Sequence, residues 1–317
     1  MINISEKIAV CSRSFSRNLT LRTELLARYK NVTFNDSGRQ LEGFELVDFL
    51  KGHTRAITAL EVIDESILCL LPDLRVIGKY GVGLDMLDLS AMERHGVLLG
   101  WTPGVNKRSA AELTLAFAIM MLRKIPQAST EVKSGVWRQI TGSLLTGRAV
   151  GIIGCGNIGK ELVRMLEPFG CQILVHDLVL DLDFNRRYKI QPLDLDALLR
   201  KSDVVTLHLP LNNSTRNILS PERLLLMKPS AILINAARGG LVDEAALKLS
   251  LVSERLAGAA FDVFVDEPPL NHELLECPNF LATPHIGGSS HESILAMGRA
   301  AIDGLEINQS ATSYACS

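Results

Sequence analysis

The sequence predicts an α/β protein with two doubly wound parallel-sheet domains. Three observations support this prediction: short β-branched runs alternate with helical patterns, the alternation occurs twice along the chain, and a glycine-rich turn lies near the start of the second alternation. The length of 317 residues also favours two domains over one.

Five short runs near the N-terminus predict the first parallel sheet. They are KIAVCS (7–12), VTFN (32–35), RAITAL (55–60), RVIGKYG (75–81) and VLLG (97–100), with helical patterns such as 19–30 and 87–95 between them. A helix between two strands of one sheet favours a parallel pair, because the chain must cross back over the sheet. A long helix over 109–123 and a loop region with Trp137 follow.

The second alternation predicts the second sheet and the return of the chain to the first. Its strands are expected at 148–154, 171–177, 203–209, 231–237, 256–264 and 280–284. Ser220 followed by Pro221 is a typical helix start, and so is Asp243 followed by an acidic residue. The last helix, at 290–307, is expected to belong to the first domain. We therefore place one domain at 1–102 and 289–317 and the other at 103–288.

The composition argues against several classes of protein. A hydrophobic content of 47%, a charged content of 21% and a net charge of −2 describe a globular protein without an electrostatic footprint for nucleic acid. The longest apolar run, Leu113 to Leu122, is too short to span a bilayer. The six cysteines are scattered without the spacing of a zinc site, so we expect free thiols and no metal. The N-terminus lacks a signal-peptide pattern, which predicts a cytoplasmic location.

The segment GIIGCGNIGKEL (151–162) places three glycines between an apolar strand and a helix. In this context the GxGxxG spacing predicts a dinucleotide site. Gly154 would make the tight turn, Gly156 would let the backbone approach a pyrophosphate, and Gly159 would let the helix pack close to the strand. The phosphates would lie at the helix N-terminus. Cys155, within the turn, is interpreted as a small filler residue.

Asp177 ends the next predicted strand, 18 residues after Gly159. Its carboxylate would accept hydrogen bonds from the adenosine ribose and repel a 2′-phosphate, which favours NAD over NADP. Arg186 and Arg187 lie beyond it and could soften this preference, so residual use of NADP stays open.

Three functional side chains follow strands of the second alternation: Arg238 in NAARGG, Glu267 in FDVFVDEPP and His285 in TPHIGG. The carboxyl ends of parallel strands share one edge of a sheet, so these residues could converge on one crevice. A guanidinium can orient a 2-oxo acid, a histidine can exchange a proton near neutral pH, and a carboxylate can favour the protonated imidazole. The structural alternatives are a helix cap at Arg238, a proline-bounded turn at Glu267 and a plain loop histidine.

Taken together, the ordered motifs resemble the D-isomer-specific 2-hydroxyacid dehydrogenase family over nearly the whole chain. The matching segments are KYGVGLDMLD (79–88), TPGVN with AAEL (102–113), the glycine turn, LHLPLNNSTRN (207–217), NAARGGLVDEAAL (235–247), FDVFVDEPP and TPHIGGSS. This group includes 3-phosphoglycerate dehydrogenases and glyoxylate/hydroxypyruvate reductases. The resemblance implies a Rossmann NAD-binding domain inserted into a flavodoxin-like substrate domain.

The resemblance also implies which residues form the site. Arg238, Glu267 and His285 would be the catalytic residues: Arg238 holds the substrate, His285 exchanges the proton and Glu267 orients the imidazole. The N–H groups of Gly81, Val82 and Gly83, together with Arg238, would bind the substrate. The implied cofactor contacts are Val82, Gly154, Gly156, Asn157, Ile158, Gly159, Asp177, His208, Leu209, Ala236, Ala237, Arg238, Asp262, His285, Gly287 and Gly288. His208 fits a structural role about as well as a cofactor contact.

By the same resemblance, the chain is an NAD-dependent oxidoreductase that interconverts a D-2-hydroxy acid and its 2-oxo acid. A homodimer built mainly through the cofactor domain is implied, with Leu113 to Leu122 as a candidate contact. The alternatives are a D-3-phosphoglycerate dehydrogenase specifically and a non-catalytic NAD-sensing scaffold that resembles the family's corepressors. The intact set of catalytic residues argues against the scaffold.

Two expectations concern the substrate and regulation. AITALE (56–61) lacks the arginine-serine pair of phosphoglycerate-specific relatives, although Lys79, Lys107 and Arg108 remain candidates for a phosphate site. No appended regulatory domain is expected after the last helix. Which 2-hydroxy acid is used, and in which physiological direction, is left open by the sequence.

Overall fold

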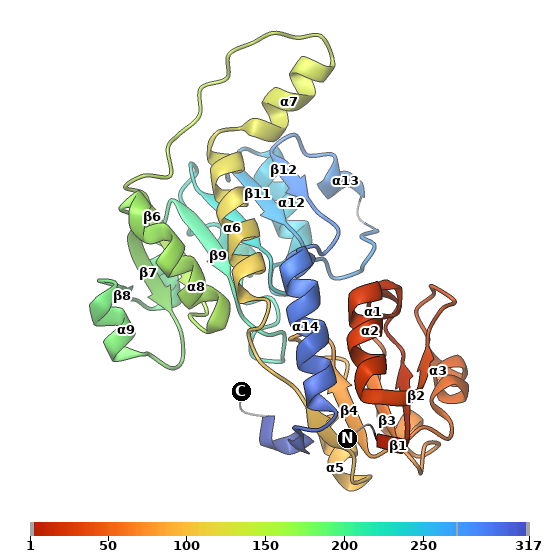
Figure 1. The fold of residues 1–317 in the computed structure, drawn as a ribbon. Coiled ribbons are helices and arrows are strands. Elements are labelled where there is room, and N and C mark those ends of the chain that lie inside the picture. Colours follow the sequence, from red (N-terminus) through yellow and green to blue (C-terminus); the bar gives the residue numbers. More distant parts are fainter. Residues whose placement is uncertain (1–2, 271, 315–317) are drawn as a thin grey trace. The chain divides into compact units, whose positions relative to one another are not determined.

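The structure is a computed structural model that describes residues 3–270 and 272–314. Its contacts divide the chain into two compact units: unit 1 comprises Met1–Asn106 with Ser290–Ser317, and unit 2 comprises Lys107–Ser289. The sequence placed the boundaries at 102/103 and 288/289, whereas the contacts place them at 106/107 and 289/290. Each unit holds a largely parallel sheet with helices around it, which confirms the predicted fold class (Figure 1).

Unit 1 has a six-stranded sheet with the order β13-β5-β4-β3-β1-β2. All pairs are parallel except β13 with β5. The strands are β1 (Asn3–Val10), β2 (Tyr29–Phe34), β3 (Arg55–Thr58), β4 (Val76–Lys79), β5 (Leu98–Gly100) and β13 (Gln309–Ser310). The helices are α1 (Arg13–Arg17), α2 (Leu19–Arg28), α3 (Gly43–Leu50), α4 (Glu65–Leu68), α5 (Leu89–Arg94), α14 (His291–Gly304) and the 3-10 turn η2 (Ala311–Tyr314). The order of β1 to β5 is the flavodoxin-like order that the resemblance implied.

The last helix of the chain, α14, packs within unit 1, as the sequence predicted. A Cβ atom built on Gly78 of β4 would lie 2.3 Å from the carbonyl oxygen of Ala301, so the helix backbone rests almost directly on the strand. Gly100 of β5 is equally close to Gly304. Glycine is required where two backbones approach this closely, and these contacts hold the C-terminal part of the chain against the N-terminal sheet.

Unit 2 has a seven-stranded parallel sheet with the order β12-β11-β10-β9-β6-β7-β8. The strands are β6 (Ala149–Ile153), β7 (Gln172–His176), β8 (Gln191–Pro192), β9 (Val204–Leu207), β10 (Ile232–Asn235), β11 (Gly258–Phe261) and β12 (Phe280–Ala282). The helices are α6 (Lys107–Leu122), α7 (Ile125–Lys133), α8 (Asn157–Leu166), α9 (Leu182–Arg187), α10 (Leu195–Lys201), α11 (Pro221–Leu224), α12 (Glu244–Val252), α13 (His272–Leu275) and the 3-10 turn η1 (Glu167–Phe169). The order reverses at β6, as in a Rossmann domain.

The central strands of unit 2 are buried on both faces, which explains their continuous apolar runs. Within β10, Ile232 and Ile234 join one hydrophobic cluster, and Leu233 joins the other. The predicted helix starts are confirmed: Ser220 accepts the backbone N–H of Arg223, and Asp243 accepts that of Ala246.

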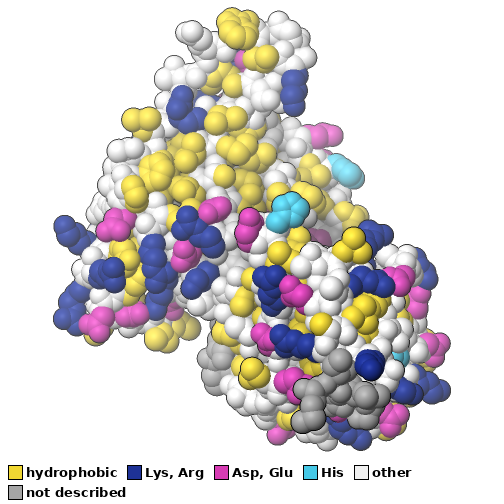
Figure 2. Space-filling model, viewed as in Figure 1, with side chains coloured by type: hydrophobic (Ala, Val, Ile, Leu, Met, Phe, Trp, Pro, Cys, Tyr) yellow, Lys and Arg dark blue, Asp and Glu magenta, His cyan; other side chains and the backbone are white. Residues whose placement is uncertain are grey.

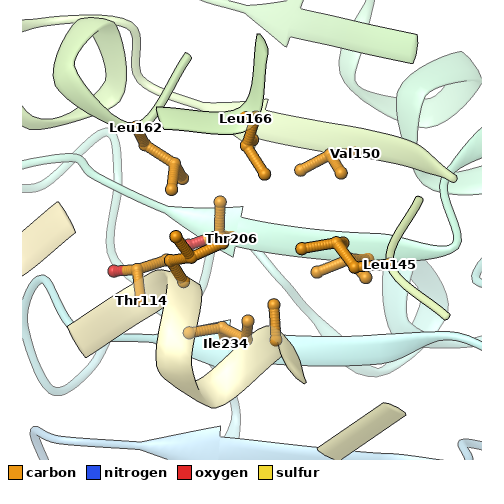
Figure 3. Close-up of a pocket in the computed structure, with 10 residues that line it drawn as sticks. Thr114, Leu145, Val150, Leu162, Leu166, Thr206 and Ile234 are labelled. Atoms are coloured by element: carbon orange, nitrogen blue, oxygen red, sulfur yellow. The ribbon is translucent and has the colours of Figure 1, made fainter. Parts of the chain in front are cut away.

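Helix α6 forms one wall of the unit 2 core together with α8. The core encloses a small void of about 10 Å³. Figure 3 shows that Thr114 of α6 and Leu162 of α8 line it together with strand residues that include Val150 and Ile234. Most of the apolar surface of α6 is therefore used inside its own unit. Among the described residues, no helix combines the length and apolar character needed to cross a bilayer.

Residues 125–148 form an arm of unit 2, and the sequence did not predict the helix within it. The sequence indicated a loop region after residue 123, but α7 forms over Ile125–Lys133, and an irregular segment over 134–148 then leads to β6. None of the residues of α7 is buried. Figure 1 shows this arm projecting from the remainder of unit 2.

Candidate active site

The three residues predicted to be catalytic follow three adjacent parallel strands, β10, β11 and β12. The imidazole Nδ1 of His285 lies 2.7 Å from Oε2 of Glu267. The charge of Arg238 acts on both of these groups. The structure therefore brings the three side chains together at the carboxyl edge of the unit 2 sheet.

The loop that carries Arg238 is held by the side chain of Asn235, the last residue of β10. Its Nδ2 donates to the carbonyl oxygen of Arg238 at 2.9 Å, and its Oδ1 accepts the N–H of Ala237 at 3.2 Å. A Cβ on the next residue, Gly239, would lie 1.9 Å from the carbonyl oxygen of Phe264. Only glycine permits this approach, which places the Arg238 loop directly against the loop that carries Glu267.

His285 has a left-handed backbone conformation, with φ of 52°, which is uncommon outside glycine. Asp262, only 1% exposed, holds this conformation. Its carboxylate accepts the N–H groups of Ile286 and Gly287, each at 2.7 Å, and the hydroxyl of Thr283 at 2.5 Å. Its carbonyl oxygen accepts the N–H of His285 at 2.9 Å. The imidazole is thus aimed by a clamp of hydrogen bonds on its own loop.

The electrostatics of the pair favour a charged imidazole. The hydrogen bond to Glu267 raises the pKa of His285, against the effect of partial burial, and the charge of Glu267 adds to the rise. Burial raises the pKa of Glu267, but the hydrogen bond and charge of His285, the N–H of Phe264 and the charge of Arg238 outweigh it, so that this pKa is lowered. The pair is therefore poised as imidazolium and carboxylate.

The glycine turn after β6 has the geometry that its spacing predicts. Gly154 has φ of 94°, and a Cβ there would lie 2.6 Å from the carbonyl oxygen of His208. A Cβ on Gly159 would lie 2.4 Å from the carbonyl oxygen of Gly154, so the helix α8 packs against the turn. A Cβ on Gly156 would meet no protein atom within 4 Å, and no side chain caps α8 there. This open N-terminus suits a pyrophosphate.

Asp177 follows β7 and lies beside the same turn. Its Oδ2 accepts the N–H of Cys155 at 2.6 Å, and its Oδ1 accepts the N–H of Val179 at 3.0 Å. Each carboxylate oxygen has a second lone pair, so the residue can support the turn and still accept a ribose hydroxyl. Burial, with the nearby charge of Asp177, raises the pKa of Cys155 to about 11, which supports its interpretation as a filler residue rather than a reactive thiol.

His208, at the end of β9, carries a buried Nδ1 atom without a hydrogen-bond partner. Its Nε2 lies 3.1 Å from the hydroxyl of Thr206, and burial lowers the pKa of His208 to about 4, so that the ring is neutral. An orphaned buried nitrogen beside the glycine turn fits a group that a bound nucleotide would satisfy. A cofactor contact and a structural role both stay predictions for His208.

The other predicted residues fall into two sets. Leu209, Ala236, Ala237, Gly287 and Gly288 lie in the loops at the carboxyl edge of the unit 2 sheet. Gly81, Val82 and Gly83 belong to unit 1, in the loop that follows β4. Residues 3–270 and 272–314 contain no group of three or more His, Cys, Asp or Glu that could hold a metal ion.

Sequence reasoning missed Asn235 and the structural role of Asp262. Both are polar residues that end, or directly follow, an apolar strand, and both are 1% exposed. A polar side chain at such a position must find partners when it is buried, and the nearest partners are the N–H and C=O groups of the loops that begin there. That signal was present in the segments NAARGG and FDVFVDEPP.

Comparison with known proteins agrees with this geometry. The profile described as D-isomer specific 2-hydroxyacid dehydrogenase, NAD binding domain, matches residues 115–287. A D-3-phosphoglycerate dehydrogenase of Methanocaldococcus jannaschii is 38% identical over 228 residues, 71% of this chain and 44% of the relative. The chain thus spans less than half the length of this relative and of a Bacillus subtilis D-3-phosphoglycerate dehydrogenase, which is 37% identical.

Solved structures are similar over nearly the whole chain. A protein from Polaromonas sp. JS6 66, described as a D-isomer specific 2-hydroxyacid dehydrogenase, has a TM-score of 0.88 and 29% identity, with 96% of each chain covered. D-lactate dehydrogenase from Aquifex aeolicus, solved with NAD and lactic acid, has a TM-score of 0.82 and 26% identity, with 95% of this chain and 94% of that chain covered. The chain belongs to the D-isomer specific 2-hydroxyacid dehydrogenase family, and unit 2 is its NAD-binding domain.

Proposed function

We propose that the protein is an NAD-dependent oxidoreductase that interconverts a 2-oxo acid and the corresponding D-2-hydroxy acid. The observation that carries this proposal is the hydrogen-bonded pair of His285 and Glu267, with Arg238 beside it, at the same sheet edge as the open glycine turn. Family membership supports it. NADH supplies the hydride when bound, and the side chains of this chain must then orient the acid and provide the proton.

The geometry assigns a role to each side chain. Since Nδ1 of His285 faces Glu267, Nε2 is the nitrogen left to donate a proton to the substrate carbonyl oxygen. Glu267 fixes the ring and stabilises its charged form. The guanidinium of Arg238 can hold the carboxylate and carbonyl oxygens of a 2-oxo acid by charge-assisted hydrogen bonds. In the reverse direction, neutral His285 takes the proton from the hydroxyl.

Three further statements about function and location are also proposals. A D-3-phosphoglycerate dehydrogenase is the specific alternative, supported by the names of the curated relatives. A non-catalytic NAD-sensing scaffold is the rival from another class, and the geometry of the three side chains argues against it. A cytoplasmic location is supported by the free state of the five cysteines that the structure describes; Cys316 lies outside the described residues.

The first prediction tests turnover. Wild-type protein should consume NADH with at least one acid of a panel of glyoxylate, hydroxypyruvate, pyruvate, branched 2-oxo acids and phosphohydroxypyruvate. His285→Ala should lower kcat by roughly 10²- to 10⁴-fold, because the proton donor is lost, while calorimetry finds nearly unchanged NADH affinity. Absence of turnover with every acid would favour the scaffold, and loss of NADH affinity in the variant would contradict the assigned role.

The second prediction concerns pH. Reduction needs protonated His285, so kcat/KM should be constant at low pH and fall as the pH rises through the raised pKa of His285. Glu267→Gln keeps an oxygen for Nδ1 but removes the charge that raises this pKa. The alkaline limb for reduction, and the acidic limb for oxidation, should therefore move together to lower pH. Unchanged limbs in both directions would show that this pair does not set the pH dependence.

The third prediction separates cofactor approach from folding within the glycine turn. Gly156→Ala should unfold at nearly the wild-type temperature, because the added Cβ meets no protein atom, yet weaken NADH binding by roughly tenfold or more, because it meets the pyrophosphate. Gly159→Ala is the matched control: its Cβ collides with the carbonyl of Gly154 and should cost about 1–3 kcal/mol of stability. Full NADH affinity in Gly156→Ala would rule out this placement of the phosphates.

We also propose a homodimer, in which the arm of α7 and residues 134–148 contacts a second copy of the chain. Trp137 is 88% exposed on this arm, and Ile125, Val132, Val136 and Leu144 are exposed as well. Figure 2 shows hydrophobic side chains at the top of the view, over the arm. Exposed apolar groups, aromatic ones above all, mark interfaces. The resemblance suggested Leu113 to Leu122 as a candidate contact; Phe117, Met121 and Leu122 of that helix pack into the unit 2 core, which favours the arm instead.

The fourth prediction tests this arm. Wild-type protein should be a dimer by light scattering after size-exclusion chromatography, and Val132→Asp with Trp137→Asp should shift it to monomer, since the charges would be buried without partners. Phe44→Asp, which replaces a side chain 82% exposed on unit 1, is the control and should remain dimeric. A wild-type monomer, or a doubly substituted dimer, would remove the arm from the interface.

A further inference from the structure

The segment from Arg238 to Glu244, which leads from β10 into α12, is anchored in the core of unit 2. Leu241 and Val242, in its middle, belong to a buried hydrophobic cluster. Three backbone hydrogen bonds of 2.8 to 3.1 Å join the segment to residues 217–219. The pairs, donor first, are Asn217 with Gly240, Leu219 with Leu241, and Asp243 with Leu219. The position of Glu244, the first residue of α12, is therefore fixed independently of the loop that carries Glu267.

The loop that carries Glu267 has weaker support of its own. Residues 265–268 are exposed, with Val265 at 58%. Glu267 bridges two groups: its Oε1 accepts the N–H of Phe264 at 3.1 Å, and its Oε2 lies 2.7 Å from Nδ1 of His285. The direction of the Glu267 carboxylate thus depends on where the backbone of Phe264 and Val265 lies.

Glu244 holds this backbone. Its Oε1 accepts the N–H of Val265 at 2.9 Å. Gly239, in the same anchored segment, packs against the same peptide: a Cβ there would lie 1.9 Å from the carbonyl oxygen of Phe264 and 2.6 Å from the nitrogen of Val265. The peptide between Phe264 and Val265 is therefore held twice by the segment that also carries Arg238, once by packing and once by a hydrogen bond.

A role in starting the helix does not account for the side chain of Glu244. Acidic residues are common in the first turn of a helix, but Asp243 already caps α12 with its side chain. Burial and the charges of Asp266 and Asp243 raise the pKa of Glu244, against the effect of the hydrogen bond from Val265. The surroundings thus disfavour a charge at this position, and the contact that favours the carboxylate is the one with the loop of Glu267.

We propose that Glu244 is a positioning residue of the candidate active site. It holds the N–H of Val265, and through this peptide it keeps the Glu267 carboxylate on Nδ1 of His285. The inference rests on the proposed function and adds to it a residue that acts through Glu267 rather than on the reacting groups. Because the donor is an uncharged N–H, the role requires an oxygen acceptor of sufficient reach rather than a negative charge.

The fifth prediction breaks this hydrogen bond. Glu244→Ala removes the acceptor, and Glu244→Asp keeps the charge on a shorter side chain. In both variants the pKa of His285, followed by NMR titration of its imidazole, should fall, because the hydrogen bond to Glu267 is the main cause of its rise. The kcat for reduction near neutral pH should fall by roughly 10- to 100-fold, while KM stays close to the wild-type value because the Arg238 segment remains anchored. Glu244→Gln retains an oxygen acceptor and should keep the wild-type pKa and kcat.

Controls separate positioning from folding. His285→Ala identifies the imidazole resonance by its loss. Asp243→Ala removes the cap of the same helix, so it should lower the melting temperature without moving the pKa of His285. An unchanged pKa of His285 in folded Glu244→Ala and Glu244→Asp proteins overturns the proposal, and so does an equal fall in Glu244→Gln or Asp243→Ala. The titration needs no substrate, so this failure is distinct from absence of turnover by the wild-type protein with every acid of the panel, which overturns the proposed function instead.

Discussion

The carboxylate of Asp262 is the constraint on which the candidate site depends. A left-handed backbone at a residue other than glycine costs about 1–3 kcal/mol and persists only where the surrounding structure enforces it. At His285 the buried residue Asp262 enforces the conformation. Its carboxylate accepts one hydroxyl and two N–H groups of the loop, and its carbonyl oxygen accepts the N–H of His285. Without this clamp the loop could relax, and the imidazole would no longer be directed at Glu267.

The clamp also has an electrostatic consequence. The Asp262 carboxylate accepts hydrogen bonds from uncharged groups, two N–H groups and a hydroxyl, which leave its negative charge in place. That charge contributes to the raised pKa of His285, after the larger effect of Glu267. Arg238 opposes this rise, since it lies near both members of the pair. The charges of two carboxylates and one guanidinium thus have opposite effects on the pKa of His285. The histidine can gain and lose a proton while its orientation is fixed.

Much of this arrangement could be predicted from the sequence, because its causes are local. Strands buried on both faces appear in the sequence as apolar runs, and helix starts appear as Ser or Asp. Positions where two backbones touch require glycine, which appears at fixed spacing. The two-residue strands β8 and β13 are too short to leave such a signal. Helix α7 buries none of its residues in its own unit, so no core contact marks it in the sequence. The direction of the Asp262 side chain depends on tertiary contacts, so the spacing of residues along the sequence does not predict it.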